Sequence, residues 1–328
     1  MIQQPEIASK PIVTLTLSPT IDLAFQSNEI RPIRKNRTVE QRIDAGGGGI
    51  NVARVLRELG AEAYAIYLAG GATGLVLNEL VAKLDVPRKR IDIAGSTRIS
   101  FTVFEEISGL EYRFVSEGAA LLEAEWQSAL SELNASDADY VVASGSLPPG
   151  VPVDYYARLA HVVRSKGARL ILDTSGPALQ AAISAGGIYF AKPSLGEFEF
   201  LTHRKIESEE ELAEAATSLV ANGSVENLAV TMGRDGALLA HRSGTLRLRG
   251  PKVKALSAVG AGDSFVAGMT FALARRENVE DAFMLGMAAG AAAVLTHGNQ
   301  LCRREDVERL HAEVVAERTC AHAADVAQ

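Results

Sequence analysis

The sequence has little cysteine, no excess of positive charge and no long hydrophobic run, and each shortage excludes a class of protein. Its 328 residues contain only Cys302 and Cys320, without metal-ligand spacing, so neither a disulfide framework nor a zinc site is expected. The net charge of -7 argues against nucleic acid or an anionic membrane as the main partner, because phosphate backbones need concentrated positive charge. Hydrophobic residues still form 47% of the chain, which is enough for a sizeable core.

The missing hydrophobic run bears on where the protein resides. The longest uncharged apolar run, Ala282–Leu295, is shorter than the roughly 20 residues that a membrane-spanning helix needs, so it predicts a buried helix. The first residues, Met1–Glu6, contain an acid and lack a basic flank and an apolar stretch, which predicts no secretory signal. We therefore expect a cytoplasmic protein in a reducing compartment.

Strand and helix patterns alternate along most of the chain. The first strand, at 12–17, is β-branched and apolar, and a helix with apolar residues at helical spacing follows at 49–60. Strands that alternate with helices imply right-handed crossovers and a mostly parallel sheet covered on both faces, so we expect an α/β fold. Further strands are predicted at 63–69, 140–143, 168–172 and 188–191, and further helices at 153–166, 177–184, 261–275, 279–295 and 303–316.

Two segments interrupt this alternation. Residues 99–107 and 111–115 alternate apolar and polar side chains around Ser108-Gly109, which is a β-hairpin signal. Residues 23–44 are also extended and polar in pattern, and neither segment has the helical period that would let it join the layered core. We expect them to form a small antiparallel sheet over the core, which would expose one face unless it covered a ligand or another subunit.

The first of these segments in the chain carries a local basic patch. Between Arg31 and Arg42 five basic residues, Lys35 among them, accompany a single acid, Glu40. Such a patch on an acidic protein suits a small anionic ligand. A solvated loop with chance charges is an equal alternative from composition alone.

A run of four glycines precedes the first predicted helix. In Asp44-Ala45-Gly46-Gly47-Gly48-Gly49-Ile50-Asn51 the backbone can approach a polar ligand closely and offer free amides at a helix start. The spacing fails the dinucleotide fingerprint, because the third glycine would fall on Asn51 or Val52, and the chain contains no Gly-x-x-x-x-Gly-Lys-Ser/Thr phosphate loop. A ligand-binding loop is favoured over a merely flexible one.

A second glycine turn opens the predicted helix at 261–275. In Gly260-Ala261-Gly262-Asp263 the backbone amides at the helix start would form an anion hole for a phosphoryl group, with a carboxylate beside it. By itself, Asp263 has about even odds of being a catalytic base or an acid that simply favours the first helical turn. The glycine run upstream favours the base.

A third glycine segment, Thr231–Gly236, lies between two apolar strands and contains Asp-Gly, so its local pattern predicts an ordinary hairpin turn.

Other catalytic chemistries find little support in the sequence. The histidines are scattered without a metal-binding pair, and Gly145-Ser146 is not set in a Gly-x-Ser-x-Gly elbow, which argues against a hydrolase.

Together these motifs resemble the PfkB, or ribokinase-like, family of carbohydrate kinases, over Thr14 to about residue 310. The resemblance implies a three-layer α/β/α sandwich with a mostly parallel sheet and a small β-sheet lid. It places a kinase domain at 11–316, lid segments at about 23–44 and 97–117, and a loose tail at 317–328. The matching segments are Thr14–Asp22, Gly46–Arg54, Ser144–Gly150, Lys192-Pro193 and Val259–Ser264.

The resemblance also implies residue roles. It makes the enzyme ATP- and Mg²⁺-dependent, with a monovalent cation such as K⁺ as a further ligand, and Asp263 becomes the base that activates a sugar hydroxyl. The amides of Gly260, Ala261 and Gly262 would complete the anion hole. The sugar and its phosphate would be bound by Asp22, Gly47, Gly48, Asn51, Arg98, Ser146 and, from a neighbouring subunit, Lys35. ATP and Mg²⁺ would face Lys192, Ser194, Glu197, Thr231, Gly233 and Gly236, and the monovalent cation Ser257, Val259, Thr296 and Gly298.

Position 48 favours one substrate. Relatives that phosphorylate fructose 1-phosphate or tagatose 6-phosphate usually carry lysine there, whereas Gly48 resembles the 6-phosphofructokinase branch. We therefore expect fructose 6-phosphate, with the two other phosphosugars as alternatives and a catalytically silent binding protein as a further one. A lid shared between subunits predicts a homodimer that could assemble into a tetramer.

The chain departs from the family pattern at two positions. Ser194 stands where the family has asparagine, which puts the Mg²⁺ and phosphate network in doubt. Gln300 replaces an arginine, which weakens the cation assignment.

Overall fold

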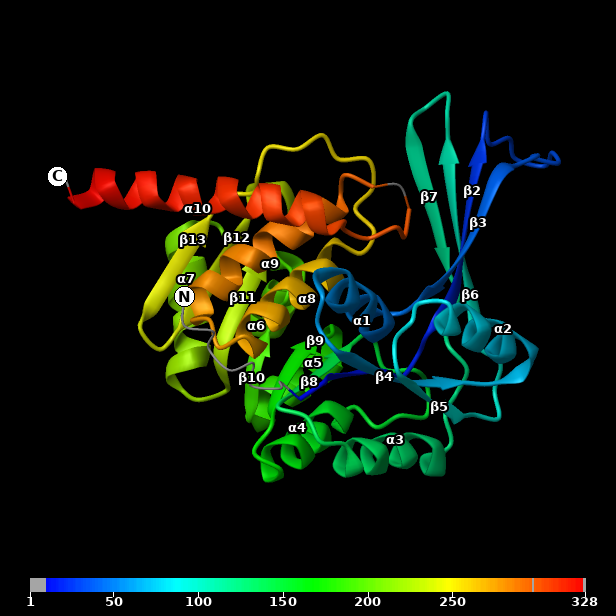
Figure 1. Ribbon diagram of the computed structural model, residues 1–328, viewed down its shortest axis with the longest axis horizontal. Helices are drawn as coiled ribbons and strands as arrows, with labels where there is room; N and C mark the ends of the chain where they lie inside the picture. Colours follow the sequence, from blue (N-terminus) through cyan, green and yellow to red (C-terminus); the bar gives the residue numbers. More distant parts are fainter. Residues whose placement is uncertain (1–9, 297, 327–328) are drawn as a thin grey trace, which may run out of the picture.

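The computed structural model describes residues 10–296 and 298–326, and its centre is a nine-stranded sheet of order β13-β12-β11-β10-β9-β8-β1-β4-β5 (Figure 1). Only the β11–β12 and β12–β13 pairings are antiparallel. The predicted mostly parallel α/β fold is therefore confirmed. The strands are β1 (Ile12–Thr16), β4 (Ala63–Ala69), β5 (Arg88–Asp92), β8 (Tyr140–Ser144), β9 (Arg169–Asp173), β10 (Ile188–Ala191), β11 (Val225–Thr231), β12 (Ala237–His241) and β13 (Gly244–Leu248).

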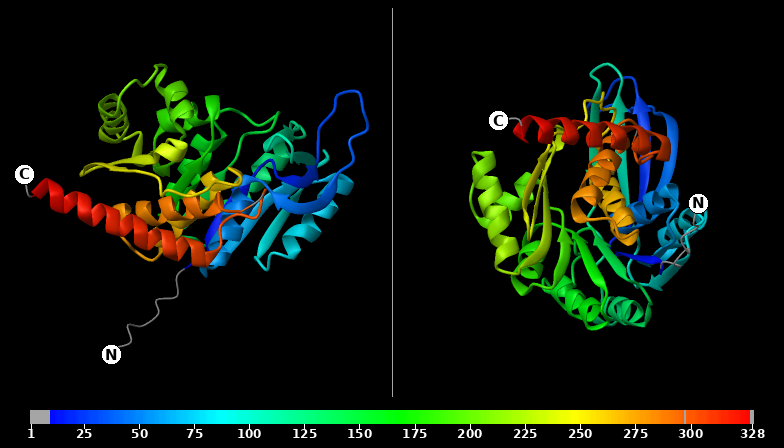
Figure 2. Two further views of the ribbon diagram at one scale, coloured as in Figure 1. Left: turned by 90° about the horizontal axis from the view of Figure 1, so that it is seen from above. Right: turned by 60° about the vertical axis from the view of Figure 1, so that its left-hand side comes forward.

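Helices cover both faces of this sheet, because successive strand residues point to opposite sides. Ile12 packs in one buried cluster and its neighbour Val13 in the other. Figure 2 shows the resulting layers. One face carries α1 (Gly48–Leu59), α8 (Ala261–Ala274), α9 (Val279–Ala293) and α10 (Arg304–Val326); the other carries α3 (Glu123–Ala135), α4 (Tyr155–Ser165), α5 (Gly176–Ala185), α6 (Leu195–Thr202) and α7 (Glu209–Ala221).

A four-stranded sheet, of order β3-β2-β6-β7, rises from one end of these layers (Figure 1). Its strands are β2 (Thr20–Ser27), β3 (Val39–Gly46), β6 (Arg98–Glu105) and β7 (Leu110–Val115), and its base packs on α2 (Gly71–Ala82). The expectation of an antiparallel sheet was wrong in one pairing, since β2 and β6 are parallel. The two strands follow β1 and β5, which run the same way in the large sheet, so both leave it in one direction.

The last helix is longer than the sequence pattern indicated. It was expected to end at 316, and it continues to Val326. The segment beyond 316 contains neither glycine nor proline and is rich in alanine, so no residue in it favours a helix end. No helix among the described residues is both long and apolar enough to cross a membrane.

The run at 282–295 forms most of α9 and is buried, as predicted, and α9 packs tightly on α8. The contact depends on small residues. A Cβ added to Gly268 of α8 would lie 2.8 Å from the Cβ of Ala289 and 2.8 Å from the carbonyl oxygen of Leu285. This packing matters for function because α8 begins beside Asp263.

We expect Gly268→Ala to lower the free energy of unfolding by about 1–3 kcal/mol, because overpacking strains a close-packed interface. Gly196→Ala in α6 is the matched control, since a Cβ there meets nothing within 4 Å and should add about 0.5–1 kcal/mol. Urea denaturation of both variants measures the difference. Equal stability of the two variants would contradict the close α8–α9 contact.

Candidate active site

The strand order creates a crevice at the carboxyl edge of the large sheet. From β1 the chain builds β4 and β5 on one side and β8 to β13 on the other, and ligands of open α/β sheets bind at such a switch point. Three polar side chains end or follow neighbouring strands at this edge. They are Ser144 of β8, Asp173 of β9 and Lys192 after β10.

The glycine run before α1 packs closely against β1, β2 and β8 at this crevice. A Cβ on Gly46 would lie 2.0 Å from Oδ2 of Asp22, and one on Gly48 would lie 2.1 Å from Oγ of Ser144. Gly47 has a φ of 112°, in the region that favours glycine. A side chain at any of these positions would displace a neighbour, so the glycines bring the start of α1 against both β1 and β8.

A cavity of about 190 Å³ lies between this loop, the small sheet and the start of α8. Residues separated by most of the chain meet in it, because β2, α1 and α8 all begin there. Of the residues singled out in the sequence, its lining includes Asp22, Gly47, Gly48, Asn51, Arg98, Val259, Gly260, Asp263 and Gly298.

Asp263 lies in the first turn of α8 with both carboxylate oxygens engaged. Asn51 donates from Nδ2 to Oδ2 at 2.9 Å, and Ser144 donates from Oγ to Oδ1 at 3.3 Å. Burial, and then the negative charge of Asp173, raise the pKa of Asp263 to about 7, against the opposing effects of Asn51 and Lys192. A carboxylate with this pKa can accept a proton near neutral pH.

Asp22 is a second perturbed carboxylate in the same cavity. Burial raises its pKa to about 6, while the positive charge of Arg113 acts in the opposite direction. Asn299 donates from Nδ2 to Oδ2 of Asp22 at 2.8 Å, which ties β2 to the loop between α9 and α10. Two carboxylates therefore line one small cavity.

The start of α8 forms a positively polarised corner. Gly260 precedes the helix with a φ of 73°, and the first N–H groups of a helix have no intrahelical acceptor. Lys192 lies at this corner, where its Nζ would be 3.3 Å from a Cβ on Gly262, and it pairs with Asp173 at 3.2 Å. Burial raises the pKa of Asp173 against the effect of Lys192. An anion fits between the helix amides and the ammonium group.

Ser194 caps α6 in place of the family asparagine. Its backbone N–H and its hydroxyl both donate to Oε2 of Glu197, at 2.7 and 2.8 Å, and the N–H of Glu197 points back to the serine oxygen at 3.4 Å. The shorter residue thus keeps Glu197 in a fixed position. Glu197 lines a cavity of about 240 Å³ together with Ser146, Asp173 and Asp263.

This second cavity offers oxygen ligands but no complete metal cage. Among the described residues, no group of three His, Cys, Asp or Glu side chains could hold an ion by itself. Mg²⁺ prefers one or two carboxylates combined with phosphate and water oxygens. The arrangement of Glu197 and Asp173 fits that kind of site.

The Thr231–Gly236 turn joins β11 to β12, which form the predicted hairpin. The N–H of Thr231 donates to the carbonyl of Pro193 at 3.0 Å, so the turn starts beside the Lys192–Glu197 segment. Gly233 begins the short 3-10 turn and Gly236 follows it, and neither lines the 240 Å³ cavity. Gly236 has a φ of 98° and leaves no room for a side chain against Leu248.

Of the four residues expected around a monovalent cation, two line the 190 Å³ cavity and two already make hydrogen bonds elsewhere. Val259 and Gly298 line the 190 Å³ cavity. Ser257 and Thr296 are buried and already engaged, Ser257 with Glu111 at 3.3 Å and Thr296 with the carbonyls of Ala293 and Leu301 at 2.9 Å.

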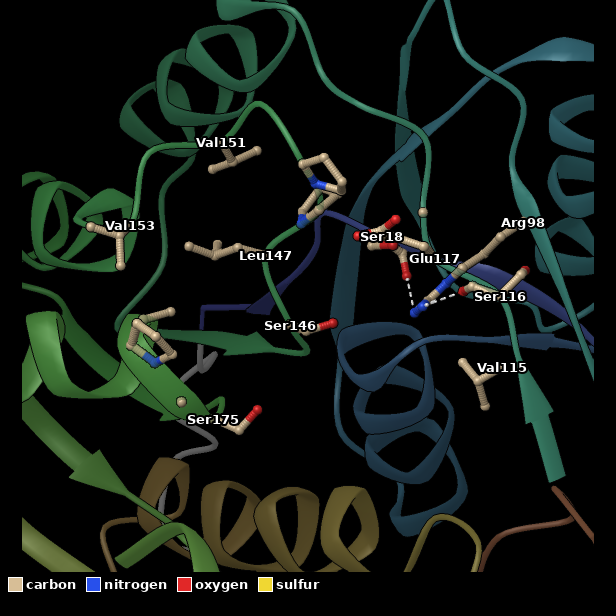
Figure 3. Close-up of a pocket in the computed structure, with 16 residues that line it drawn as sticks. Ser18, Arg98, Val115, Ser116, Glu117, Ser146, Leu147, Val151, Val153 and Ser175 are labelled. Atoms are coloured by element: carbon tan, nitrogen blue, oxygen red, sulfur yellow. Dashed lines mark hydrogen bonds between the residues drawn. The ribbon is translucent and has the colours of Figure 1, made fainter. Parts of the chain in front are cut away.

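A larger cavity, of about 730 Å³, adjoins the first one at Arg98 (Figure 3). Arg98 donates to the carbonyls of Ser18 and Ser116 at 2.9 and 3.2 Å, and Ser146 enters the cavity from the other side. Both hydrogen-bond partners of Arg98 are neutral carbonyls, and the negative charge of Asp22 acts on it electrostatically, so the guanidinium can still bind an anion in this cavity. Lys35 is exposed in the loop between β2 and β3 and does not line any of these cavities.

The sequence motifs missed several residues of this site. Asp173 and Ser144 had a signal, since each ends an apolar strand at the carboxyl edge of a parallel sheet. Arg113 and Asn299 had none, because they reach the cavity from a hairpin and from an irregular loop.

Comparisons with known proteins agree with this geometry. The family model described as pfkB family carbohydrate kinase matches residues 12–306. The chain is 44% identical over 310 residues to the ATP-dependent 6-phosphofructokinase isozyme 2 of Mycobacterium tuberculosis, covering 94% of this chain and 91% of that one. It is 39% identical over 302 residues to the Escherichia coli isozyme 2, covering 92% and 98%. More distant relatives include a 1-phosphofructokinase of Borreliella burgdorferi (32% identity, covering 93% and 98%) and a tagatose-6-phosphate kinase of Staphylococcus epidermidis (30%, covering 85% and 90%).

Solved structures give the same result. Phosphofructokinase-2 from Escherichia coli in complex with potassium has a TM-score of 0.90 and 38% identity, covering 93% of this chain and 99% of that one. Its complex with fructose-6-phosphate and its tetrameric inhibited form have TM-scores of 0.88 at the same identity and coverage. The chain therefore belongs to the pfkB family of carbohydrate kinases and is a sugar-phosphate kinase.

Proposed function

We propose that the protein transfers the γ-phosphoryl group of ATP to the C1 hydroxyl of fructose 6-phosphate, which yields fructose 1,6-bisphosphate and ADP. The observation that carries the proposal is the position of Asp263. Its carboxylate faces the sugar-sized cavity, has a pKa of about 7 and lies at the same helix start as Lys192. The names of the two relatives at 44% and 39% identity support the choice of sugar.

In this mechanism Asp263 accepts the proton of the C1 hydroxyl as that oxygen attacks the phosphorus atom in line. Asn51 and Ser144 hold the carboxylate in place through their hydrogen bonds. The charge that spreads over the phosphoryl oxygens is stabilised by the amides at Gly260–Gly262, of which that of Ala261 also donates to the carbonyl of Ala258 at 3.5 Å, and by Lys192. Closure of the small sheet over the cavity would exclude water, which otherwise competes with the sugar.

The remaining ligands follow from the cavities. ATP would extend from the Lys192–Glu197 segment towards the Thr231–Gly236 turn. Bound Mg²⁺ would neutralise phosphate charge, and Glu197 would bind its water ligands. The carbonyls near Val259 and Gly298 are the part of the proposed K⁺ site that borders the sugar cavity.

Two features favour fructose 6-phosphate over the other phosphosugars. Gly48 has no space for a lysine while Ser144 keeps its position, because a Cβ would lie 2.1 Å from the serine oxygen. The phosphate would instead bind at Arg98 and Ser146, on the side of the 730 Å³ cavity, together with Lys35 of the partner subunit.

The substrate is tested by measuring ADP release against a panel of phosphosugars. We expect kcat/KM to be highest for fructose 6-phosphate, with tagatose 6-phosphate and fructose 1-phosphate at least tenfold lower, since misplaced phosphate and hydroxyl groups each cost about 1–3 kcal/mol. A higher kcat/KM for either of the other two sugars would assign the enzyme to that sugar. No turnover with the whole panel would refute the kinase proposal.

The acid limb of the pH profile tests Asp263. Its raised pKa predicts that kcat/KM falls about tenfold per pH unit below about pH 7, because only the ionised carboxylate accepts a proton. Asp263→Asn should lower kcat by about 10²–10⁴-fold at every pH. A limb well below pH 6, or an active Asp263→Asn variant, would contradict the assignment.

The raised pKa of Asp263 also predicts how the stability of the Asp263→Asn variant depends on pH, which shows whether the inactive variant is folded. The folded state binds this proton more tightly than the unfolded state does, so ionisation of Asp263 costs stability as pH rises through the interval from 3.8 to about 7. Asp263→Asn should therefore melt at a higher temperature than the wild type at pH 8. The difference should shrink towards pH 4.

The outer face of the small sheet supports a dimer. Ile43, Leu23, Phe101 and Phe114 are cross-strand neighbours on one face, and Phe101 and Phe114 are 41% and 60% exposed. Exposed apolar rows of this kind are typical of protein interfaces. We infer that two subunits pair through this face, which would also bring Lys35 to the partner's site.

We expect Phe114→Asp to give a monomer with a raised KM for fructose 6-phosphate, because it places a charge in the apolar row. Light scattering after gel filtration measures the mass. Val315→Asp on α10 is the control, since this residue is 37% exposed outside the small sheet. An unchanged mass for Phe114→Asp would rule out this interface.

A further inference from the structure

Arg54 of α1 has no role in the mechanism above, yet its guanidinium group contacts the end of β3, the first turn of α1 and the loop after α9, all of which border the sugar cavity. Its Nη1 donates to Oδ1 of Asn51 at 3.3 Å and to the carbonyl of Ala45 at 3.2 Å, and its Nη2 donates to the carbonyl of Asn299 at 3.1 Å. All three acceptors are neutral. No carboxylate among the described residues pairs with Arg54, and a half-buried charge without such a partner is costly, so its arrangement calls for an explanation.

The bond to Asn51 determines which way that amide faces. An asparagine side chain has one oxygen that accepts and one nitrogen that donates. With Oδ1 directed at Arg54, one turn further along α1, Nδ2 points the opposite way and donates to Oδ2 of Asp263 at 2.9 Å. A flipped amide would place its oxygen against the carboxylate and its N–H group against the guanidinium. Arg54 therefore excludes the orientation in which Asn51 would repel Asp263.

The bond to Asn299 acts on the other carboxylate. The backbone of Asn299 is held by Arg54, and its side chain donates to Oδ2 of Asp22 at 2.8 Å. This tie steadies a strained loop, because Leu301, two residues after Asn299, has a φ of 61°, which is unfavourable for a residue with a side chain. Asn299 is only 5% exposed and packed by its neighbours, so a shift of its backbone would also move the side chain that holds Asp22.

We propose that Arg54 is a positioning residue that sets both carboxylates of the sugar cavity, Asp263 through the Asn51 amide and Asp22 through the Asn299 loop. Arg54 also contributes a positive charge at longer range. Asp44, Asp22 and Asp263 all favour its charged form, against the burial that lowers its pKa. By reciprocity its charge favours ionised Asp263. The inference rests on the proposed role of Asp263 as the base.

The test compares three substitutions of Arg54 in the full-length protein with fructose 6-phosphate and MgATP. Arg54→Met removes both the charge and the hydrogen bonds, so kcat/KM should fall about 100-fold, the cost of a misplaced reacting group, and the acid limb should move to higher pH. Arg54→Lys keeps the charge but cannot bond three separated oxygens, so kcat/KM should stay low with the limb near its wild-type position. Added guanidinium ions should restore activity to Arg54→Ala.

Arg57→Met is the matched control, because Arg57 lies one turn further along the same helix and pairs with Asp85 at the surface. It should leave kcat/KM and the pH limb unchanged. A lower melting temperature for Arg54→Met with wild-type kcat/KM and pH limb would overturn the inference, and so would full activity of Arg54→Lys. If Arg54→Met does not fold, the inference is tested by the activity of Arg54→Lys and by the guanidinium rescue of Arg54→Ala, and full activity of the first or no rescue of the second would overturn it.

The outcome for Arg54 is separable from the outcome for the proposed base. Inactive Asp263→Asn with wild-type behaviour of Arg54→Met and Arg54→Lys would overturn the role of Arg54 alone. Active Asp263→Asn would overturn the proposed base, and the role of Arg54 in setting it falls with that base.

Discussion

The structure depends on keeping negative charge at the start of α8, where two carboxylates and one ammonium group share a confined space. Burial and then Asp173 raise the pKa of Asp263, burial and then Glu197 raise the pKa of Asp173, and Lys192 acts against both shifts. The same helix start attracts anions. The corner is therefore suited to a negatively charged phosphoryl group and keeps a carboxylate available as a base near neutral pH, at a cost in stability that functional sites commonly carry.

This electrostatic arrangement requires close approach of backbones, and small residues make that possible. Gly262 leaves space for Lys192, and Gly48 leaves space for Ser144. Gly268 lets α8 pack against α9, which fixes the direction of the helix that carries Asp263. The glycines of these two loops thus serve the site chiefly by what they allow their neighbours to do, and among Gly46–Gly49, Gly260 and Gly262 only Gly47 and Gly260 have a positive φ.

The small sheet connects the site to the outside of the molecule. One of its faces lines the sugar cavity with Asp22 and Arg113, and the opposite face exposes an apolar row. Alternation along each strand produces this division, because neighbouring residues point to opposite faces. Substrate binding and subunit pairing, as proposed, would use the two faces of the same four strands, so a change in one is expected to affect the other.

The sequence by itself determined the family, the α/β class and the position of Asp263, because these depend on local patterns. Short apolar runs identified most strands of the large sheet, and the Gly-Ala-Gly-Asp turn placed a carboxylate at a helix start. Only the tertiary structure decided which residues complete the site. Asn299 and Arg113 reach the cavity from segments without a motif, and Arg54 joins nearby oxygens of Ala45 and Asn51 to the distant carbonyl of Asn299.

The parallel pairing of β2 with β6 and the raised pKa of Asp263 were likewise settled in three dimensions. The direction of β2 and β6 depends on the strands of the large sheet that precede them in the chain. The pKa of Asp263 depends on its burial and on the charges that the fold brings near it. Neither quantity is encoded in a window of neighbouring residues. Local sequence sets what a segment can form, whereas long-range packing sets which groups meet and how strongly they interact.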